Sequence, residues 1–534
     1  MFIHRNKKKI KNKTYHSTLL MHNYRKDGKV RHKTIMNLSK WSDAEVNALD
    51  RMLKGERSLT HQDIELGQGK SIGAIWILKQ LAEDLGIVSI LGNDRQSRIM
   101  LLLIVSRIIT QGSRRHALHW AETQSIDIVF GLTEIKKDEL YDALDRLSER
   151  QSEIEERLFK QRYANNPPSL YLYDVTSSYI EGDQNECGHW GYNRDGKKGT
   201  KQIVIGLLMA EDGIPIAVDV FEGNTSDTAT VSTQIHTLTQ RFQVGKVTLV
   251  GDKGMIKGPQ IEALSTKGIS YITSITKSQI RTLIHEGTVQ LSLFDDQLVE
   301  VRDGNIRYIL RRNPTRESEM RQARDSKLAC IEECVAKENA LMAEKTKRKH
   351  STSQLIIMKK IESLKYSKMV SLHYSDNRIF SLIINEEEKA TNAQLDGCYV
   401  LKTDLSLADK STQSVHQSYK QLAIVESAFR TIKTTCLEVR PIYVRKKSRT
   451  RGHVFLTMLS FMIVTAFNQK TTDIPKLTTE EKISILDHIH LTAITIFGKT
   501  IIKIPTLPPI AKQILERLNI SMPSEVSLNK TMCS

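Results

Sequence analysis

Residues 170–176 read LYLYDVT and residues 246–252 read KVTLVGD, and these two short stretches predict the centre of a β-sheet. Both are rich in the aromatic and β-branched residues typical of strands, and turn-forming residues flank them. A near-continuous apolar run such as 246–252 is expected of a strand whose two faces are both covered. Each stretch also carries an acid, Asp174 within the first and Asp252 at the end of the second.

The neighbouring segments predict three further strands and two helices. The strands are expected over 201–209, 214–220 and 269–276, and the helices over 228–242 and 258–267. The resulting order is strand, strand, strand, helix, strand, helix, strand, with an antiparallel start and parallel later strands. This is the order of an RNase H-like sheet. The expected fold class is therefore α/β, with a mixed sheet flanked by helices.

The two acids predict a metal site. An ionised carboxylate is costly inside a sheet unless it is paired or bound to a cation. In an RNase H-like sheet the strands of Asp174 and Asp252 lie side by side, so the two carboxylates would repel each other, and a hard cation with oxygen ligands would relieve that repulsion. The alternative is that Asp174 faces solvent and Asp252 only begins a turn.

A third acid, Glu426, lies in a long helix predicted over 411–435. At about 100° per residue, Tyr419, Arg430 and Lys433 lie within about 40° of Glu426 on the helix wheel. The opposite face is apolar and is expected to pack on the sheet; it carries Ile424, Val425, Ala428 and Ile432. The alternative is an amphipathic helix with an ordinary charged face, which periodicity alone does not exclude.

The chain is strongly basic, and the excess is concentrated at its start. The formal net charge is +17, and residues 1–40 hold 12 Lys/Arg against the single acid Asp27, a net +11. This distribution favours a polyanionic partner, with an N-terminal arm or small domain on nucleic acid. A merely solvated basic surface is the alternative. A helix-turn-helix near residues 112–115 (GSRR) is only weakly indicated.

The cysteines and apolar runs exclude other classes of protein. The six cysteines form no CxxC pair, so a zinc site or a disulfide framework is not expected and a reducing cytoplasm fits. The start lacks the apolar segment of a signal peptide. The longest apolar runs, 99–105 and 456–467, fall short of the ~20 residues that a membrane-spanning helix needs. We expect a cytoplasmic protein with no membrane partner.

Residues 419–433, YKQLAIVESAFRTIK, resemble the Y-x2-R-x3-E-x6-K signature of bacterial insertion-sequence DDE transposases. Tyr419, Glu426 and Lys433 match, whereas Leu422 stands at the Arg position. Other matching motifs follow in the right order: DVT at 174–176, GYNRDG through FEGNTSD over 191–227, and VGDKGM at 250–255, where Lys253 replaces the usual Arg. The resemblance covers residues 170–470 well and the two ends loosely.

The resemblance implies a DNA transposase that cleaves and joins strands at insertion-sequence ends by a DDE mechanism. Asp174 would bridge two Mg²⁺ ions, with Mn²⁺ as an acceptable substitute, and Asp252 and Glu426 would each hold one. Tyr419, Arg430, Lys433 and Lys253 would contact DNA phosphates. The partners are double-stranded DNA, as element ends and target, and a second copy of the chain in a synaptic complex. The rival functions are a nuclease of the same fold that does not join strands and a non-catalytic DNA-binding derivative.

The departure at Leu422 predicts a substitute cation. Leucine cannot contact an anion, and Arg430 lies one turn beyond Glu426 on the same stripe of the helix. Lys420 lies at about 120° and points away from the site. We therefore expect Arg430 to supply the phosphate contact and Leu422 to serve packing.

Six segments are expected. The roughly 130 residues between the last core strand and the Glu426 helix exceed an ordinary loop, and the resemblance implies a β-rich insertion there. The highly charged stretch 315–349 within it is a solvated helical hairpin or, less favoured, a DNA-facing arm. The segments are a basic β-hairpin segment at 1–58, a helical DNA-binding region at 59–165, the first part of the catalytic core at 166–280, the insertion at 281–403, the second part of the core at 404–470 and a C-terminal helical region at 471–534.

Overall fold

The computed structural model describes residues 1–10, 13–55, 64–345, 347–375, 378–434, 437–474, 476–496 and 499–523. These residues form two compact units. One consists of residues 144–462, and the other combines residues 1–143 with 463–534. The division falls within two helices, α7 (Lys137–Glu149) and α17 (Lys447–Lys470). The chain therefore leaves one unit, forms the other and returns.

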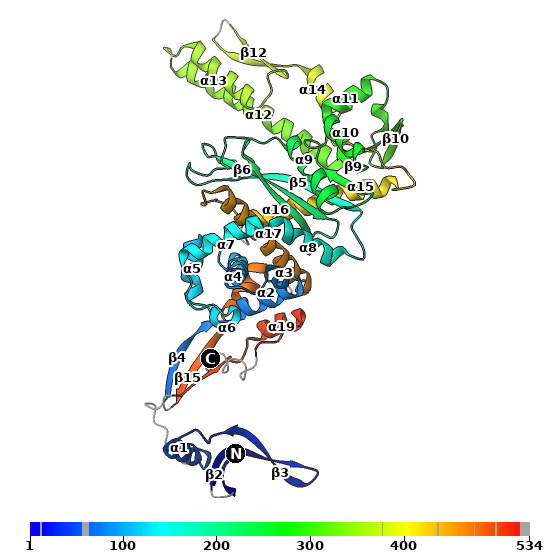
Figure 1. The fold of residues 1–534 in the computed structure, drawn as a ribbon. Coiled ribbons are helices and arrows are strands. Elements are labelled where there is room, and N and C mark those ends of the chain that lie inside the picture. The colour runs from blue at the N-terminus through cyan, green and yellow to red at the C-terminus, as the bar shows by residue number, and fades with distance from the viewer. Residues whose placement is uncertain are drawn as a thin grey trace. The chain divides into compact units, whose positions relative to one another are not determined.

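A mixed eight-stranded sheet lies at the centre of residues 144–462, in the order β10-β11-β14-β9-β8-β5-β6-β7 (Figure 1). Its strands are β5 (Leu170–Tyr179), β6 (Gln202–Ala210), β7 (Pro215–Glu222), β8 (Thr248–Gly251), β9 (Ser270–Ser274), β10 (Val299–Asp303), β11 (Ile306–Arg312) and β14 (Cys398–Thr403). β5 pairs antiparallel with β6 and parallel with β8, and β8 pairs parallel with β9. The predictions of a mixed α/β fold, and of neighbouring strands at 170–176 and 246–252, are confirmed.

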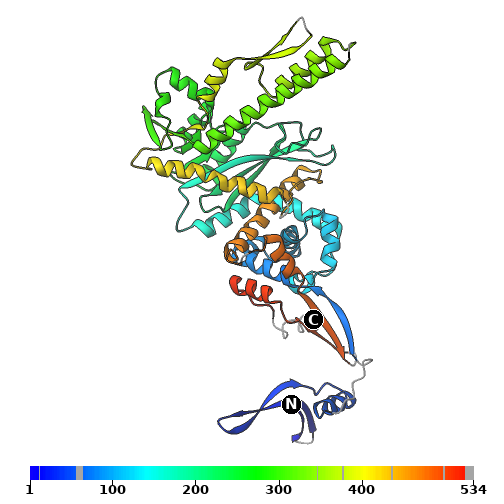
Figure 2. The same cartoon turned by 180° about the vertical axis from the view of Figure 1, so that it is seen from behind.

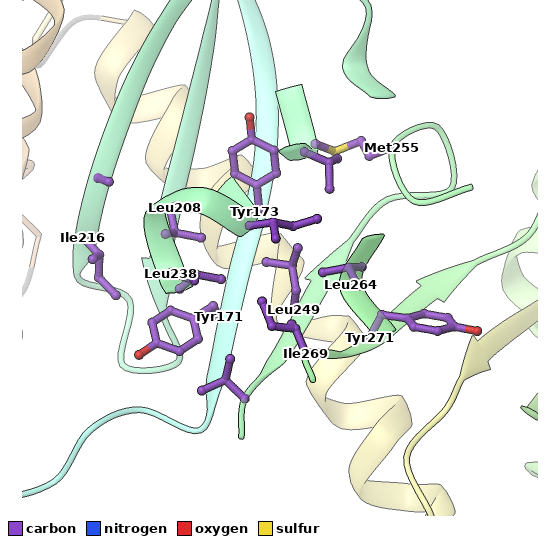
Figure 3. Close-up of a cluster of buried hydrophobic side chains, with 14 of the residues drawn as sticks. Tyr171, Tyr173, Leu208, Ile216, Leu238, Leu249, Met255, Leu264, Ile269 and Tyr271 are labelled. Carbon is purple, nitrogen blue, oxygen red and sulfur yellow. The ribbon is translucent and has the colours of Figure 1, made fainter. Parts of the chain in front are cut away.

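The core of this unit fixes which way the β5 side chains point. Tyr171 and Tyr173 of β5 and Leu249 of β8 belong to one buried cluster (Figure 3). That cluster also receives side chains from α8 (Gln151–Tyr163), α9 (Asp227–His236) and α10 (Gly258–Thr266). Because successive strand residues point to opposite faces, Asp174 points to the other face. There α16 (Leu422–Lys433) packs on β5.

Three strands of the expected insertion extend the core sheet instead of forming a layer of their own. β14 pairs antiparallel with β9, and β11 pairs with β14 and β10. These pairings satisfy the edge of β9, which would otherwise present unpaired backbone groups. The boundary expected after residue 403 therefore coincides with the end of a core strand. The insertion was expected to be a β-rich domain, whereas three of its strands belong to the core sheet.

The remainder of residues 281–403 is mostly helical. It contains α12 (Pro314–Glu344), α13 (His350–Ser363) and α14 (Glu386–Ala393), with a hairpin of β12 (Val370–Tyr374) and β13 (Phe380–Ile384). α12 packs on α13 through Leu328, Ile331 and Ile357 (Figure 2). The charged stretch 315–349 is thus the first arm of a helical hairpin, and the second arm begins just after it.

The other unit joins segments from both ends of the chain. Its helices are α2 (Gly73–Asp84), α3 (Ile87–Leu91), α4 (Arg95–Ile109), α5 (Arg114–Glu122), α6 (Ile126–Phe130), α18 (Thr479–Asp487) and α19 (Pro509–Leu518). Its sheet has the order β16 (Lys499–Lys503), β15 (His490–Ile496), β4 (Ile64–Ser71). The C-terminal region expected to be helical therefore also contains a β-hairpin. Local periodicity gave no sign of it because β15 pairs with a strand more than 400 residues earlier.

The basic N-terminal segment forms a three-stranded sheet of β1 (Phe2–Ile10), β2 (Lys13–Lys26) and β3 (Lys29–Asn37), followed by α1 (Asp43–Leu53). The predicted hairpin is confirmed between β2 and β3. Its turn residues Asp27 and Gly28 both have positive φ, 55° and 73°. That backbone is typical of a two-residue hairpin turn. Residues 112–115, near which the sequence weakly indicated a helix-turn-helix, join α4 to α5, and Arg114 there is buried.

Within the described part of the chain, α17 is long and apolar enough to cross a membrane by length and composition. It is longer than the apolar run 456–467 suggested, with 24 residues. However, 83% of its most apolar window is buried inside the protein. Such burial is what a core helix of a folded domain shows.

Arg307 connects the added strands to the loop that leads into α15 (Thr412–Lys420). Its side chain is 3% exposed, and its guanidinium donates to Glu300 Oε2 at 2.7 Å. It also donates to the backbone carbonyl oxygens of Leu405, Ser406 and Lys410. The Thr412 hydroxyl donates to Glu300 Oε2 at 2.6 Å. One buried ion pair thus fixes the start of the helical segment that precedes α16.

We expect Arg307→Met to lower the free energy of unfolding by about 3–5 kcal/mol, because it leaves a partly buried carboxylate and three carbonyls without their donor. Arg302→Met is the matched control, since Arg302 contacts the same Glu300 but is 52% exposed. Its loss should stay below about 1 kcal/mol. Chemical denaturation of the full chain measures both, and equal losses in the two variants would contradict this role of Arg307.

Candidate active site

Asp174 and Asp252 are brought together by the pairing of β5 with β8. The parallel register sets Tyr173 of β5 opposite Gly251 of β8. The next residue along each strand is an aspartate, Asp174 after Tyr173 and Asp252 after Gly251, so the two lie side by side. Asp174 is half-buried and its Oδ1 accepts a hydrogen bond from the Val175 amide at 2.8 Å. Asp252 is exposed in the turn that follows β8.

Glu426 lies on α16, on the exposed side of the helix, whereas Val425, Ala428 and Ile432 are buried. The predicted apolar face therefore packs as expected. The helix predicted over 411–435 is two helices, α15 and α16, separated at Gln421; residue 435 lies outside the described residues. The Gln421 amide donates to the carbonyls of both residues 417 and 418, each at 3.2 Å. This tightened turn interrupts the regular helical pattern.

The three acids influence one another electrostatically. The pKa of Asp174 is raised to about 7, chiefly by burial; the negative charges of Asp252 and Glu426 contribute to the increase, while the Val175 amide and Arg194 oppose it. A carboxyl group with such neighbours is half protonated near neutral pH. Asp174 therefore lies within electrostatic reach of both other acids, one from the sheet and one from α16.

The donor set suits a hard divalent cation, since carboxylate oxygens are the ligands that Mg²⁺ prefers. Among the described residues, however, no group of three or more acidic, histidine or cysteine side chains is gathered closely enough to hold an ion as it stands. The protein thus presents three mutually repelling carboxylates at one end of the sheet, with the chemistry but not the closed geometry of a metal site.

Tyr419 contacts one of the acids directly. Its hydroxyl donates to Asp252 Oδ1 at 3.2 Å and lies 2.8 Å from Ser274 Oγ at the end of β9. Burial raises the pKa of the Tyr419 phenol, so it stays protonated and able to donate. The structure therefore gives Tyr419 a protein partner at the position where the sequence predicted a phosphate contact.

Lys433 also has a protein partner. Its ammonium donates to Asp195 Oδ1 at 2.8 Å, and Arg440 contacts the same oxygen. The Asp195 side chain is 3% exposed and that of Lys433 11%. Burial lowers the pKa of Lys433, which the carboxylate of Asp195 offsets. Lys433 thus anchors the connection between β5 and β6 to the end of α16.

Two models of known protein families match this chain, each over a separate part of it. Residues 165–463, more than half of the chain, match the family model described as the transposase DDE domain. The chain belongs to the DDE transposase family. Residues 3–63 of this transposase match a second model, the N-terminal domain of IS1634 family transposases. The expectation of an insertion-sequence DDE transposase is thereby confirmed at the level of family.

Two solved transposase structures resemble this one weakly. One is a piggyBac transposase synaptic complex with hairpin DNA, at 8% identity over 86% of this chain and 82% of that chain, with a TM-score of 0.37. The other is a Mos1 transposase paired-end complex with the left transposon end, at 12% identity over 30% of this chain and 56% of that one, with a TM-score of 0.14. At these TM-scores neither carries weight for fold or function. A comparison with curated protein sequences gave no match.

The remaining predicted cations of the transposase are open to solvent. Lys253 and Arg430 are exposed, and neither side chain has an ion pair with another described residue. Leu422 is 8% exposed and packs in the core face of α16. The exposure of Arg430 and the burial of Leu422 agree with the roles expected of these two residues.

Sequence reasoning assigned no role to four residues that shape the site. Arg194 forms an ion pair with Asp227 at 2.5 Å, Asp195 holds Lys433, and Ser274 contacts Tyr419. Three of the four lie in the block 191–227 that resembles the family, so the signal was present as a motif. The sequence did not show which residues pair: Asp195 and Ser274 contact Lys433 and Tyr419 from distant segments, and Arg194 and Asp227 lie at opposite ends of the block.

We expect Asp174→Asn to stabilise the metal-free transposase at alkaline pH. A carboxyl whose folded pKa, about 7, lies above its unfolded value destabilises the fold as pH rises from about 4 to about 7, because the folded state holds its proton more tightly. The melting temperature of the variant should therefore exceed that of the wild type by a margin that grows over this interval and then levels off. Thermal denaturation in chelator measures it, and a margin that does not vary with pH would contradict the assignment.

Proposed function

We propose that this transposase cleaves DNA at the ends of an insertion sequence and joins those ends to a target, using Asp174, Asp252 and Glu426 as its catalytic acids on an RNase H-like core. The observation that carries the proposal is the electrostatic coupling of Asp174 to both other acids, which come from separate parts of the chain. A role confined to binding DNA would give no reason to hold three negative charges near a polyanion.

Two Mg²⁺ ions, or Mn²⁺ in their place, would be held by the carboxylates of Asp174, Asp252 and Glu426. Such ions lower the pKa of an attacking water or 3′-hydroxyl and stabilise the leaving oxygen. The protein's own part is to place the three acids and to orient the phosphate, since phosphoryl transfer depends mainly on positioning and charge.

The surrounding residues hold the acids and the DNA in place. Tyr419 orients Asp252 through its hydroxyl hydrogen bond, and Lys433 fixes the β5–β6 connection through Asp195. Both were predicted to hold phosphates, and their protein partners favour positioning roles instead. Arg430 and Lys253 remain the cations free to contact phosphate oxygens beside the acids.

DNA binding extends beyond the acids. The net +11 on residues 1–40 supports a sequence-independent contribution to affinity from the N-terminal sheet and the helical region after it. The substrates would be double-stranded element ends and target DNA, brought together by a homodimer in a synaptic complex. The transposase would act in the cytoplasm, close to the nucleoid. A nuclease of the same fold that does not join strands is the competing function.

We expect Asp174→Asn, Asp252→Asn and Glu426→Gln each to abolish metal-dependent cleavage of the element's own end DNA while leaving end binding largely unchanged. The reason is that each loses one negatively charged ligand at the metal site. Asp183→Asn, which alters an exposed acid in the loop after β5, is the control. Near-wild-type cleavage by any of the three would remove that residue from the triad. Cleavage without conversion of a supercoiled target by a pre-cut end would favour the nuclease.

We expect Arg430→Ala to lower cleavage by one to two orders of magnitude, or about 1.5–3 kcal/mol for a charge-assisted hydrogen bond to phosphate. Lys420→Ala is the matched control, because Lys420 is an exposed cation on α15, outside the helix that carries Glu426. Leu422→Ala should act mainly on stability. Unimpaired cleavage by Arg430→Ala together with a loss in Lys420→Ala would overturn the assignment.

A further inference from the structure

The carboxyl end of β9 lies at the edge of the sheet that carries the acids. β5, β8 and β9 run parallel, so their carboxyl ends share one edge, which is where α/β sheets bind their ligands. The register sets Gly251 opposite Thr273, and therefore Asp252 beside Ser274. The Tyr419 hydroxyl contacts both of the latter residues. The segment that follows β9 thus begins next to a catalytic acid.

Lys277 is the first charged residue after β9. It begins α11 (Lys277–His285), three residues beyond Ser274. Thr276 caps that helix, since its hydroxyl oxygen accepts a hydrogen bond from the Gln279 amide at 3.3 Å. Such a cap fixes the backbone at the start of a helix. The Lys277 side chain is 39% exposed, so its backbone is held at this edge while a ligand can still reach its ammonium.

The protein only partly neutralises the charge of Lys277. Its ion pair within the described part of the chain is with Asp396, and 3.5 Å separates Lys277 Nζ from Asp396 Oδ1. A charge-assisted hydrogen bond is usually about 2.7–2.9 Å long, so this contact is weak. Asp396 is buried, and its other carboxylate oxygen contacts Arg324. One carboxylate therefore serves two cations, and the Lys277 ammonium keeps most of its capacity to bind another anion.

Other cations lie close to Lys277. The pKa of Lys277 is lowered, chiefly by burial and also by the positive charges of three neighbours, Arg324, Arg281 and Lys253. Arg281 is exposed, and its guanidinium donates to the neutral amide oxygen of Asn392 at 2.9 Å. Lys253 is exposed as well. Like charges gathered in one place repel one another, and an anion between them relieves that repulsion.

We infer that Lys277 binds a backbone phosphate of DNA near the scissile phosphate, on the side of the acids toward β9 and α11, with Arg281 and Lys253 beside it. The inference rests on the proposed function, because it takes DNA as the substrate of the neighbouring acids. That function brings two DNA segments to the acids, the element end with its flank and the target, and both present the same phosphates. Lys277 is then a positioning residue that holds the strand without touching the reacting atoms.

The test combines a neutral phosphate in the DNA with a neutral side chain in the protein. Duplexes carry one methylphosphonate, moved stepwise across the cleavage site of the element end and, separately, along a target duplex. At one position it should weaken wild-type binding by about tenfold, because a charge-assisted contact is lost. Lys277→Met should weaken binding of the unmodified duplex by a similar factor and lose the sensitivity at that position alone. The duplex that contains the sensitive position identifies the DNA segment that Lys277 holds.

Two further variants serve as controls. Lys277→Arg should keep the affinity and the sensitive position, since it also carries a positive charge. Lys267→Met should change neither, because Lys267 is an exposed lysine at the end of α10, before β9, and so lies at the opposite edge of the sheet.

Fluorescence anisotropy without divalent ions measures these affinities, so the result does not depend on cleavage. If the triad variants kept their cleavage, the proposed catalytic acids would be wrong and this assay would still decide the role of Lys277. No sensitive position in either duplex, a sensitivity that persists in Lys277→Met, or an equal loss in Lys267→Met would overturn the inference.

Discussion

Repulsion between carboxylates is the constraint on which the catalytic half of the molecule depends. The parallel register of β5 and β8 sets Asp174 beside Asp252, and α16 adds Glu426 from the opposite layer. A fold gains nothing in stability from this arrangement when no cation is present. Burial is the main cause of the raised pKa of Asp174, and the charges of Asp252 and Glu426 add to the increase. The site is therefore maintained by the packing around it, chiefly the apolar face of α16 on β5.

Contacts with neighbouring side chains keep the three acids from moving apart. Tyr419 on α15, itself in contact with Ser274 at the end of β9, restrains Asp252, and Lys433 binds Asp195 and so ties the β5–β6 connection to α16. Further out, the Glu300–Arg307 pair holds the loop before α15. The three strands added beyond β9 are thus part of the support of the catalytic helix, which explains why they extend the sheet instead of folding separately.

The sequence was sufficient where local pattern decides structure. The apolar runs around Asp174 and Asp252 predicted two adjacent strands, the apolar residues opposite Glu426 predicted most of the buried face of its helix, and the N-terminal segment was predicted to form a hairpin. It was insufficient where the partner lies far along the chain. Lys433 looked like a phosphate ligand because its buried partner Asp195 lies 238 residues away. The pairing of β11 and β14 with the core sheet, and that of β15 with β4, was not predicted for the same reason, since pairing between distant segments leaves no periodic trace.

The pairing of β15 with β4 has a consequence for the order in which the two units can fold during synthesis. The edge of β4 stays unpaired until residues 490–496 have been synthesised, whereas residues 144–462 contain all of their own sheet. Gly69 approaches the Leu491 backbone so closely that no side chain would fit, which ties this junction to one partner strand. Since domains fold as units during synthesis, the unit of residues 144–462 can form on the ribosome first. A chain cut short before residue 490 would carry Asp174, Asp252 and Glu426 but not a finished N-terminal unit.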